Sequence, residues 1–333
     1  MTEESSDHDN VTSKRAPISR TPTVEMSAMR GSFSPISGWY PPGMINTVQA
    51  VILGLIQGIT ELFPISSLGH SVIIPKLLGW NLDQNAPSFL TFLIATHLAT
   101  AIVLFLIFIK DWIEILKGLG RSLRDRKILP ADTYAKLGWL LVIGTVPAGI
   151  LGLALEKPIR ALFASPLLGA VFLIVNGFVL FAAERLRTRE KNQAPATDPA
   201  LSDAEISTIS WKQALGIGTA QAAALIPGIS RSGSSMVGGL LSGLNNENAA
   251  RFSFLLATPI IGAAALLKLP ELFSPAMAAE RPAFLLGALC SAGAAWLSTK
   301  FLLRFFETRT LTPFAIYCVA GGAAYLALML AAG

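Results

Sequence analysis

A single arginine within a long apolar region is the feature of this sequence that most strongly predicts chemistry. Arg231 lies in the run Ser230-Arg231-Ser232-Gly233, inside an apolar region at about 211–244. A guanidinium group at bilayer depth is expensive and is rarely placed there for packing, whereas its planar fork matches phosphate oxygens in a bidentate manner. Clustered hydroxyl groups and the backbone N–H groups of a following helix complete a predicted cradle for an anion.

A carboxylate and a histidine lie in a second interrupted apolar region, at about 46–80. Gln57 and Glu61 are four residues apart, so on a helix they share one face. A carboxylate at bilayer depth costs roughly 2.5–3.5 kcal/mol on insertion scales, and it therefore needs a partner or a chemical role. A serine beside His70, in a turn flanked by proline and glycine, can act as a nucleophile with its base.

Together these residues predict a phosphate site in which Arg231 supplies charge, the serines bind oxygens, and Glu61 with His70 transfers protons. Structural readings stay open beside this one: Glu61 can cap or pack a helix, and Arg231 can pair with Glu61 for structure alone. Gln57 fits an interhelical hydrogen bond as well as a catalytic role. An intramembrane hydrogen bond is expected for His97 and a helix-joining role for Asn176.

The composition places these residues in a membrane. Hydrophobic residues make up 52% of the 333 residues and charged residues only 14%, where a soluble chain carries about 25%. The apolar segments do not alternate as the strands of an outer-membrane barrel do, so an all-α polytopic fold is predicted. Six segments are long enough to span a bilayer, at roughly 88–109, 136–156, 166–183, 252–270, 282–303 and 312–332.

The two regions that hold the polar residues are interrupted in the middle by proline, glycine and serine, which end helices. Because non-helical backbone at membrane depth survives only where protein or a watery cavity surrounds it, each region predicts a re-entrant helix–turn–helix hairpin. The order of hairpin, three spans, basic loop, hairpin and three spans indicates an internal duplication. Residues 54–81 match residues 218–245 at nine of 28 positions without a gap.

The duplication predicts one membrane domain, 44–333, with repeats at about 46–183 and 211–332, after a polar, disordered tail at 1–43. Three spans per repeat invert the second copy, and inverted repeats with broken helices place a site near the midplane where the breaks meet. Basic residues gather in the connections 110–136 and 184–212, which predicts that both are cytoplasmic and that the first hairpin opens to the outside.

The net charge of +5 is therefore explained by topology, and no nucleic-acid partner is expected. Cys290 and Cys318 both lie in apolar segments, so two free thiols, without a disulfide or a metal cluster, are predicted.

Two motifs together resemble the undecaprenyl-diphosphate phosphatase family, also called bacitracin-resistance proteins. They are Gln57-Gly-Ile-Thr-Glu61-Leu-Phe-Pro-Ile-Ser66-Ser67-Leu-Gly-His70 and Pro227-Gly-Ile-Ser230-Arg231-Ser232-Gly, and the likeness extends in order over about 45–332. The resemblance implies removal of one phosphate from a C55 polyprenyl diphosphate, which regenerates the lipid carrier of cell-wall synthesis. It also implies a bacterial inner membrane and a site that faces the periplasm.

Carried over by motif position, the resemblance implies catalytic roles for Glu61, Ser67, His70 and Arg231, with Ser67 as nucleophile and His70 assisting. Substrate binding is expected of Gln57, Ser66, Ser230, Ser232 and Gly233. A divalent cation, Mg²⁺ or Ca²⁺, supports activity in the family, and Glu61 with Gln57 would be its ligands here.

Two positions depart from the family pattern. Leu68 stands where the family usually has threonine, which removes one hydroxyl group. Gln57 offers a neutral oxygen where a second acid also occurs, and a neutral oxygen is a weaker ligand for a hard cation.

Two other functions are weighed against the phosphatase. A phosphatase of the acid-phosphatase type needs a second catalytic histidine after its Ser-Arg element, but His8, His70 and His97 all precede Arg231. A flippase or transporter for polyprenyl phosphate or another anion stays open, since inverted repeats with broken helices are transporter architecture. Lipid chain length, a covalent intermediate at Ser67 and a homodimer are left undecided.

Overall fold

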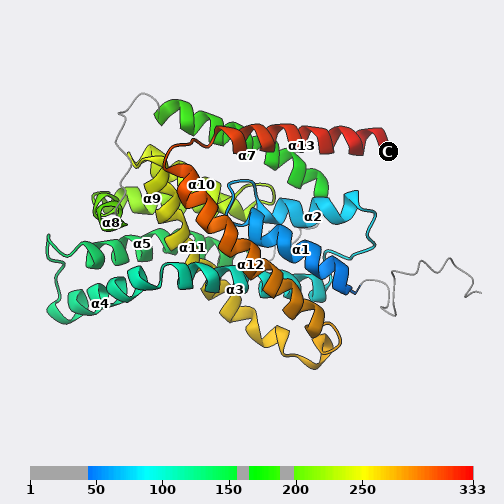
Figure 1. The fold of residues 1–333 in the computed structure, drawn as a ribbon, viewed down its shortest axis with the longest axis horizontal. Helices are drawn as coiled ribbons and strands as arrows, with labels where there is room; N and C mark the ends of the chain where they lie inside the picture. The colour runs from blue at the N-terminus through cyan, green and yellow to red at the C-terminus, as the bar shows by residue number, and fades with distance from the viewer. Residues whose placement is uncertain (1–43, 156–164, 188–198, 333) are drawn as a thin grey trace, which may run out of the picture. The chain divides into compact units, whose positions relative to one another are not determined.

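The computed structural model describes residues 44–155, 165–187 and 199–332, and the regular secondary structure of these residues is helical throughout (Figure 1). The predicted polar tail, residues 1–43, lies outside the described residues, as does part of the second basic connection, residues 188–198.

Within the described residues, six helices are long and apolar enough to cross a membrane, as the hydropathy pattern predicts. They are α3 (Pro87–Ile107), α5 (Thr133–Ala154), α7 (Pro166–Arg187), α11 (Asn246–Leu272), α12 (Arg281–Phe306) and α13 (Thr312–Ala332). Shorter elements fill the connections: α4 (Ile109–Asp125), α8 (Pro199–Ile206) and the 3₁₀ turn η2 (Pro275–Met277). The prediction of an all-α polytopic membrane protein is thereby confirmed.

The two interrupted regions form helix pairs that are broken where proline and glycine predict a break. The first pair is α1 (Thr47–Thr60) and α2 (Ser67–Leu77); the second is α9 (Trp211–Ala222), extended by the 3₁₀ turn η1 (Ala223–Leu225), and α10 (Arg231–Leu241). The two pairs begin alike, because Asn46 and Ser210 form capping boxes with the glutamine three residues later.

The first connection, treated in sequence as a basic loop at 110–136, is largely the helix α4. Trp112, Ile115, Gly118 and Ser122 recur at helical spacing and are buried. A Cβ atom at Gly118 would lie 2.5 Å from the backbone nitrogen of Ala135, so α4 packs tightly against the first turns of α5. Charged residues on the opposite side of α4 dominate its composition, so the composition of this segment did not predict the buried stripe.

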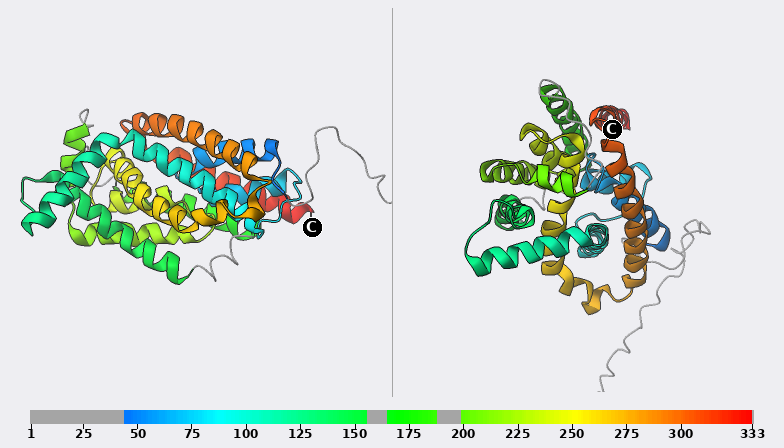
Figure 2. Two further views of the ribbon diagram at one scale, coloured as in Figure 1. Left: turned by 90° about the horizontal axis from the view of Figure 1, so that it is seen from below. Right: turned by 60° about the vertical axis from the view of Figure 1, so that its left-hand side comes forward.

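The most extensive helix–helix contacts join one repeat to the other. Helix α1 lies along α12, α9 along α5, α3 along α11, and α13 along α7 (Figures 1 and 2). Two of these crossings depend on glycine: a Cβ atom at Gly54 would lie 2.2 Å from the carbonyl oxygen of Gly287, and one at Gly218 would lie 2.2 Å from that of Gly144. Gly54 and Gly218 occupy equivalent positions in the repeats, so the duplication is visible in the packing.

Helix α11 joins the apolar core to a buried ionic cluster. Phe252, Phe254, Leu255 and Leu256 are fully buried. Beside them, Nε of Arg251 donates to Oδ1 of Asp203 at 2.8 Å, and Nη2 lies 2.9 Å from Oδ1 of Asp111. Because Asp203 belongs to α8 and Asp111 to α4, this arginine fastens both connecting helices to the core.

Replacing Gly218 by alanine is expected to lower the melting temperature of the protein in detergent, because the new methyl group overlaps the Gly144 carbonyl and overpacking costs about 1–3 kcal/mol. The matched control is Gly216→Ala in the same helix, where a Cβ atom meets nothing within 4 Å. The control is expected to keep or slightly raise the melting temperature, because alanine favours a helix over glycine by about 1 kcal/mol. Equal melting temperatures would contradict the close approach of α9 and α5.

Candidate active site

The breaks of the two helix pairs meet. The backbone N–H of Ser230 donates to the side-chain oxygen of Asn176 at 3.0 Å, and the amide nitrogen of Asn176 donates to the carbonyl oxygen of Pro64 at 3.0 Å. The hydroxyl of Ser232 donates to the carbonyl oxygen of Phe63, also at 3.0 Å. The breaks are thus joined by hydrogen bonds that satisfy buried backbone groups, which a break at membrane depth requires.

Equivalent serines start the helices that leave the two breaks. Ser66 caps α2 by accepting from the N–H of Gly69 at 3.2 Å, and Ser230 caps α10 by accepting from the N–H of Gly233 at 3.1 Å. Ser66 has a φ of 69°, whereas Ser230 has an ordinary φ of −85°. A positive φ at a residue other than glycine stores strain, and such strain gathers at functional sites.

Glu61, the C-cap residue directly after α1, is the centre of the site. It is 5% exposed, and its Oε2 accepts from the hydroxyl of Ser67 at 2.6 Å and from the amide of Gln57 at 3.2 Å. Oε2 also lies 3.3 Å from Nε2 of His97, and Oε1 accepts from Nε of Arg231 at 3.0 Å. The buried carboxylate therefore accepts from the guanidinium of Arg231 and from the hydroxyl of Ser67, and the imidazole of His97 lies beside it.

Only some of the guanidinium nitrogens of Arg231 form hydrogen bonds with other groups of the protein. Nε is bonded to Glu61, and Nη1 lies 3.5 Å from the carbonyl oxygen of Ser253. Among the described residues Nη2 is buried without a hydrogen-bond partner. The residue is also the first of α10, as Ser67 is the first of α2, so two helix N-termini open beside this free donor. Free N–H groups and helix N-termini both favour a bound anion.

Both ring nitrogens of His70 contact groups other than the hydroxyl of the predicted nucleophile. Its Nδ1 lies 2.6 Å from the carbonyl oxygen of Ser66, which can only accept, so Nδ1 carries the hydrogen. Its Nε2 lies 2.8 Å from the hydroxyl of Tyr317 in α13. The hydroxyl of Ser67 is bonded instead to Glu61. A direct action of His70 on Ser67 stays a prediction, and the group that accepts the Ser67 hydroxyl hydrogen in this structure is Glu61.

The remaining predicted binding residues lie around this centre. Ser230 and Ser232 are buried with their hydroxyl oxygens 3.1 Å apart, and both donate to the carbonyl of Phe63, so in this structure they join the two breaks. Their contact with phosphate, and that of Ser66 and Gly233, stays a prediction. Leu68 packs against the apolar cluster that contains Phe89 and Phe92.

The predicted cation ligands do not form a metal site by themselves. Both carboxylate oxygens of Glu61 already have hydrogen-bond or ion-pair partners, which include the side chains of Arg231 and His97. The side-chain oxygen of Gln57 has no partner, but it is a single neutral atom. Within the described parts of the chain, no three His, Cys, Asp or Glu side chains gather where they could hold a metal ion. The residues present therefore do not fit a resident cation, and the cation stays a prediction from the resemblance.

Sequence reasoning underrated three residues of this site. His97 contacts Glu61, Tyr317 contacts His70, and Asn176 joins the two breaks. Each is a polar side chain in an otherwise apolar span, which is the signal that could have found them. Their partners lie far away in sequence, so the pairing itself could not be predicted.

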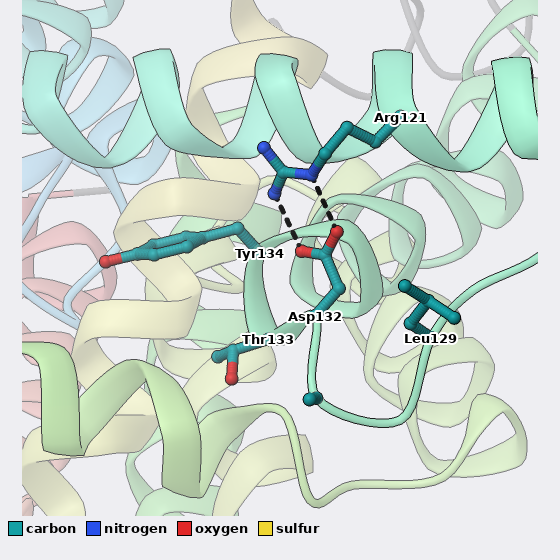
Figure 3. A pocket seen from close by; sticks show the side chains of 6 residues that line it. Arg121, Leu129, Asp132, Thr133 and Tyr134 are labelled. Atoms are coloured by element: carbon teal, nitrogen blue, oxygen red, sulfur yellow. Dashed lines mark hydrogen bonds and ion pairs between the residues drawn. The ribbon is translucent and has the colours of Figure 1, made fainter.

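A surface hollow at the start of α5 lies elsewhere (Figure 3). Arg121 and Asp132 form a bidentate pair across it with two 2.9 Å hydrogen bonds, and Leu129, Ala131, Thr133 and Tyr134 complete its lining. The hydrogen bonds from Arg121 lower the pKa of Asp132. The guanidinium group of Arg121 is already paired with this carboxylate, whereas Arg231 has a donor atom, Nη2, without a partner. The hollow therefore does not resemble the anion-binding arrangement at Arg231.

The fold and the site together define a polytopic membrane protein with a charged centre at the junction of two broken helices. The sequence profile of the family described as bacitracin resistance protein BacA matches residues 50–324. The chain belongs to this family, and the resemblance seen in its motifs is confirmed.

The chain is similar to several proteins over nearly their whole length, and these relatives are all named undecaprenyl-diphosphatase. An undecaprenyl-diphosphatase of Mycolicibacterium paratuberculosis is 47% identical over 305 residues, which cover 86% of this chain and 98% of that protein. Undecaprenyl-diphosphatase 2 of Frankia alni is 45% identical over 334 residues, with 84% and 96% covered. The undecaprenyl-diphosphatase of Acidiphilium cryptum is 46% identical over 289 residues, with 84% and 97% covered.

Asn176→Leu is expected to lower both stability and activity, because it leaves the N–H of Ser230 and the carbonyl of Pro64 buried without partners. Each such group costs about 1–3 kcal/mol. The melting temperature in detergent and the rate of phosphate release would measure the two effects. Val175→Leu, at an exposed position of the same helix, is the control and is expected to change neither. A wild-type rate and melting temperature for Asn176→Leu would show that the breaks do not depend on this bridge.

Proposed function

We propose that this protein removes the terminal phosphate from a polyprenyl diphosphate, in the way the names of its relatives state for them. The observation that carries the proposal is the 2.6 Å hydrogen bond from the hydroxyl of Ser67 to Glu61, beside a guanidinium group with a free donor. A nucleophile, a base and an anion-binding group thus lie together at the junction of two helix breaks. Phosphoryl transfer needs mainly charge neutralisation and positioning, which these groups supply.

Substrate binding begins with the free part of Arg231. Nη2 donates to an oxygen of the terminal phosphate, while the N-termini of α2 and α10 add partial positive charge on either side. Nε keeps its hydrogen bond to Glu61, so the guanidinium lies between the carboxylate and the phosphate. This arrangement reduces the repulsion between two anionic groups in one site. The polyprenyl chain stays in the bilayer.

In the chemical step, the Oγ atom of Ser67 attacks the terminal phosphorus, and its proton passes to Oε2 of Glu61. The bond from that phosphorus to the bridging oxygen breaks, and the electron pair leaves with the polyprenyl monophosphate. Glu61 passes this proton to the departing monophosphate and then takes a proton from water, whose oxygen attacks the phosphorus of the phosphoserine. The bond from that phosphorus to Oγ breaks, Oγ takes the proton back from Glu61, and inorganic phosphate leaves with the serine restored. Direct attack by water held at Glu61 would use the same base and remains the alternative to a phosphoserine.

The inner membrane and a periplasmic site are the proposed location. Exposed basic residues of the first connection support it: Lys110, Lys117, Arg121, Arg124, Arg126 and Lys127. The positive-inside rule assigns that end of α3 to the cytoplasm, which leaves the first helix pair open to the other side.

Purified protein in detergent is expected to release inorganic phosphate from undecaprenyl or farnesyl diphosphate. Arg231→Lys is expected to lower kcat/KM about 100-fold, because a single ammonium group cannot hold both Glu61 and the phosphate. Arg124→Lys, an exposed arginine of α4, is the control and is expected to leave the rate unchanged. Absence of release by folded wild-type protein, with either lipid, would overturn the phosphatase and favour the transporter, since detergent leaves no membrane to transport across.

Removal of divalent cations is expected to slow phosphate release without changing the melting temperature of the substrate-free protein. The reason is that the described residues offer no set of three ligands, so a cation would enter with the diphosphate oxygens. Phosphate release and thermal unfolding, each with and without chelator, make the comparison. A fall in the melting temperature on chelation would instead reveal a cation held by the protein alone.

A further inference from the structure

His97 reaches the centre of the site from a helix that carries neither motif. It belongs to α3, and its Nε2 lies 3.3 Å from Oε2 of Glu61, the oxygen that also accepts from Ser67. Its Nδ1 lies 2.7 Å from the carbonyl oxygen of Leu93, one turn earlier. The contact to Glu61 joins residues 36 positions apart in sequence.

Both contacts of His97 are made to oxygens that accept. A carbonyl oxygen has no hydrogen to give, and Oε2 of Glu61 already accepts from Ser67 and Gln57. The ring therefore donates on both sides as the imidazolium cation, with Nδ1 directed to its own helix and Nε2 directed to the site. The two ring nitrogens thus have different partners, the Leu93 carbonyl of α3 for Nδ1 and the Glu61 carboxylate for Nε2, and a substitution can remove one contact while it keeps the other.

The position of α3 does not depend on this side chain. Thr100 of α3 bonds to the hydroxyl of Ser291 in α12 at 3.2 Å, and that hydroxyl donates to the carbonyl of Thr96 at 3.1 Å. Phe92, one turn earlier, is fully buried against α12. The side chain of His97 is 21% exposed, more than that of any core residue of the helix, so packing does not account for it.

We infer that His97 is a positioning residue for the reaction, which fixes Oε2 of Glu61 toward the hydroxyl of Ser67. The inference rests on the proposed phosphatase activity. Arg231 holds the other carboxylate oxygen, but its guanidinium must also meet the phosphate, so its hold on Glu61 changes when substrate binds. Gln57 lies on the same helix as Glu61 and moves with it. His97, on a separately anchored helix, is the donor that keeps the carboxylate in place throughout.

The experiment compares His97→Gln with His97→Asn, which differ by one methylene group. The amide of glutamine reaches about as far as Nε2 and can donate to Glu61, whereas the amide of asparagine reaches only about as far as Nδ1 and can serve only the Leu93 carbonyl. Thr96→Val is the control: this buried neighbour bonds only to carbonyls of its own helix through its hydroxyl. Initial rates of phosphate release over a range of farnesyl diphosphate give kcat and KM, and thermal unfolding confirms folding.

The Gln variant is expected to keep kcat within about 5-fold of wild type, and the Asn variant to lose about 30-fold or more, with KM nearly constant in both. The losses follow from a mispositioned base, whose cost falls on the transition state. Thr96→Val is expected to behave as wild type.

Equal kcat values for the Gln and Asn variants, whether both fall or both stay at the wild-type value, would overturn the inference. The proposed phosphatase activity would still stand in that case, because the wild-type protein is active. A rise in KM at constant kcat would also overturn it, since it would make His97 a substrate-binding residue. Wild-type protein that releases no phosphate would overturn the proposed function and the inference together.

Discussion

The ion pair between Glu61 and Arg231 is the interaction on which the rest of the structure depends. It joins the end of α1 in one repeat to the start of α10 in the other, with the carboxylate 5% exposed. Burying both charges costs more than their attraction returns unless further hydrogen bonds satisfy them, so a buried pair is weak support for a purely stabilising role. Here the carboxylate is satisfied by Ser67, Gln57 and His97, but Nη2 of Arg231 is not. An ion pair with a purely structural role would leave no buried donor without a partner. An anion-binding site requires such a donor, and Nη2 of Arg231 is one.

The duplication explains how one site arises from two similar halves. At the repeat offset of 164 positions, Glu61 corresponds to Leu225 and Ser67 corresponds to Arg231. The first residue of the helix after each break is therefore the proposed nucleophile in one repeat and the arginine in the other. The capping serines, the glycines after them and the glycine crossings are shared, because both halves need the same backbone geometry. The scaffold is symmetric, whereas the chemistry is divided between the halves and complete only where they meet.

The hydropathy of the chain was sufficient to predict the spans, the breaks and the charged residues at membrane depth, because each is a local departure from an apolar background. The partners of those residues are non-local and could not be predicted. Asn176 gives no sign in sequence that it joins Pro64 to Ser230, and the strained φ of Ser66 has no counterpart in the equivalent Ser230. Helix α4 was missed for a different reason: its charged face dominates its composition, although its buried stripe packs against α5.

The proposal that Glu61 rather than His70 is the base rests on the contacts that each side chain already makes. His70 donates through Nδ1 to a carbonyl, and its Nε2 is occupied by Tyr317, so it would need to break one contact before it could serve Ser67. Glu61 needs no rearrangement, since it already accepts the hydroxyl hydrogen at 2.6 Å. A carboxylate beside an anionic substrate is ordinarily a poor arrangement, because like charges repel strongly in a medium of low dielectric. The guanidinium between them removes that objection, and so the same ion pair that joins the repeats also makes a carboxylate base compatible with a diphosphate.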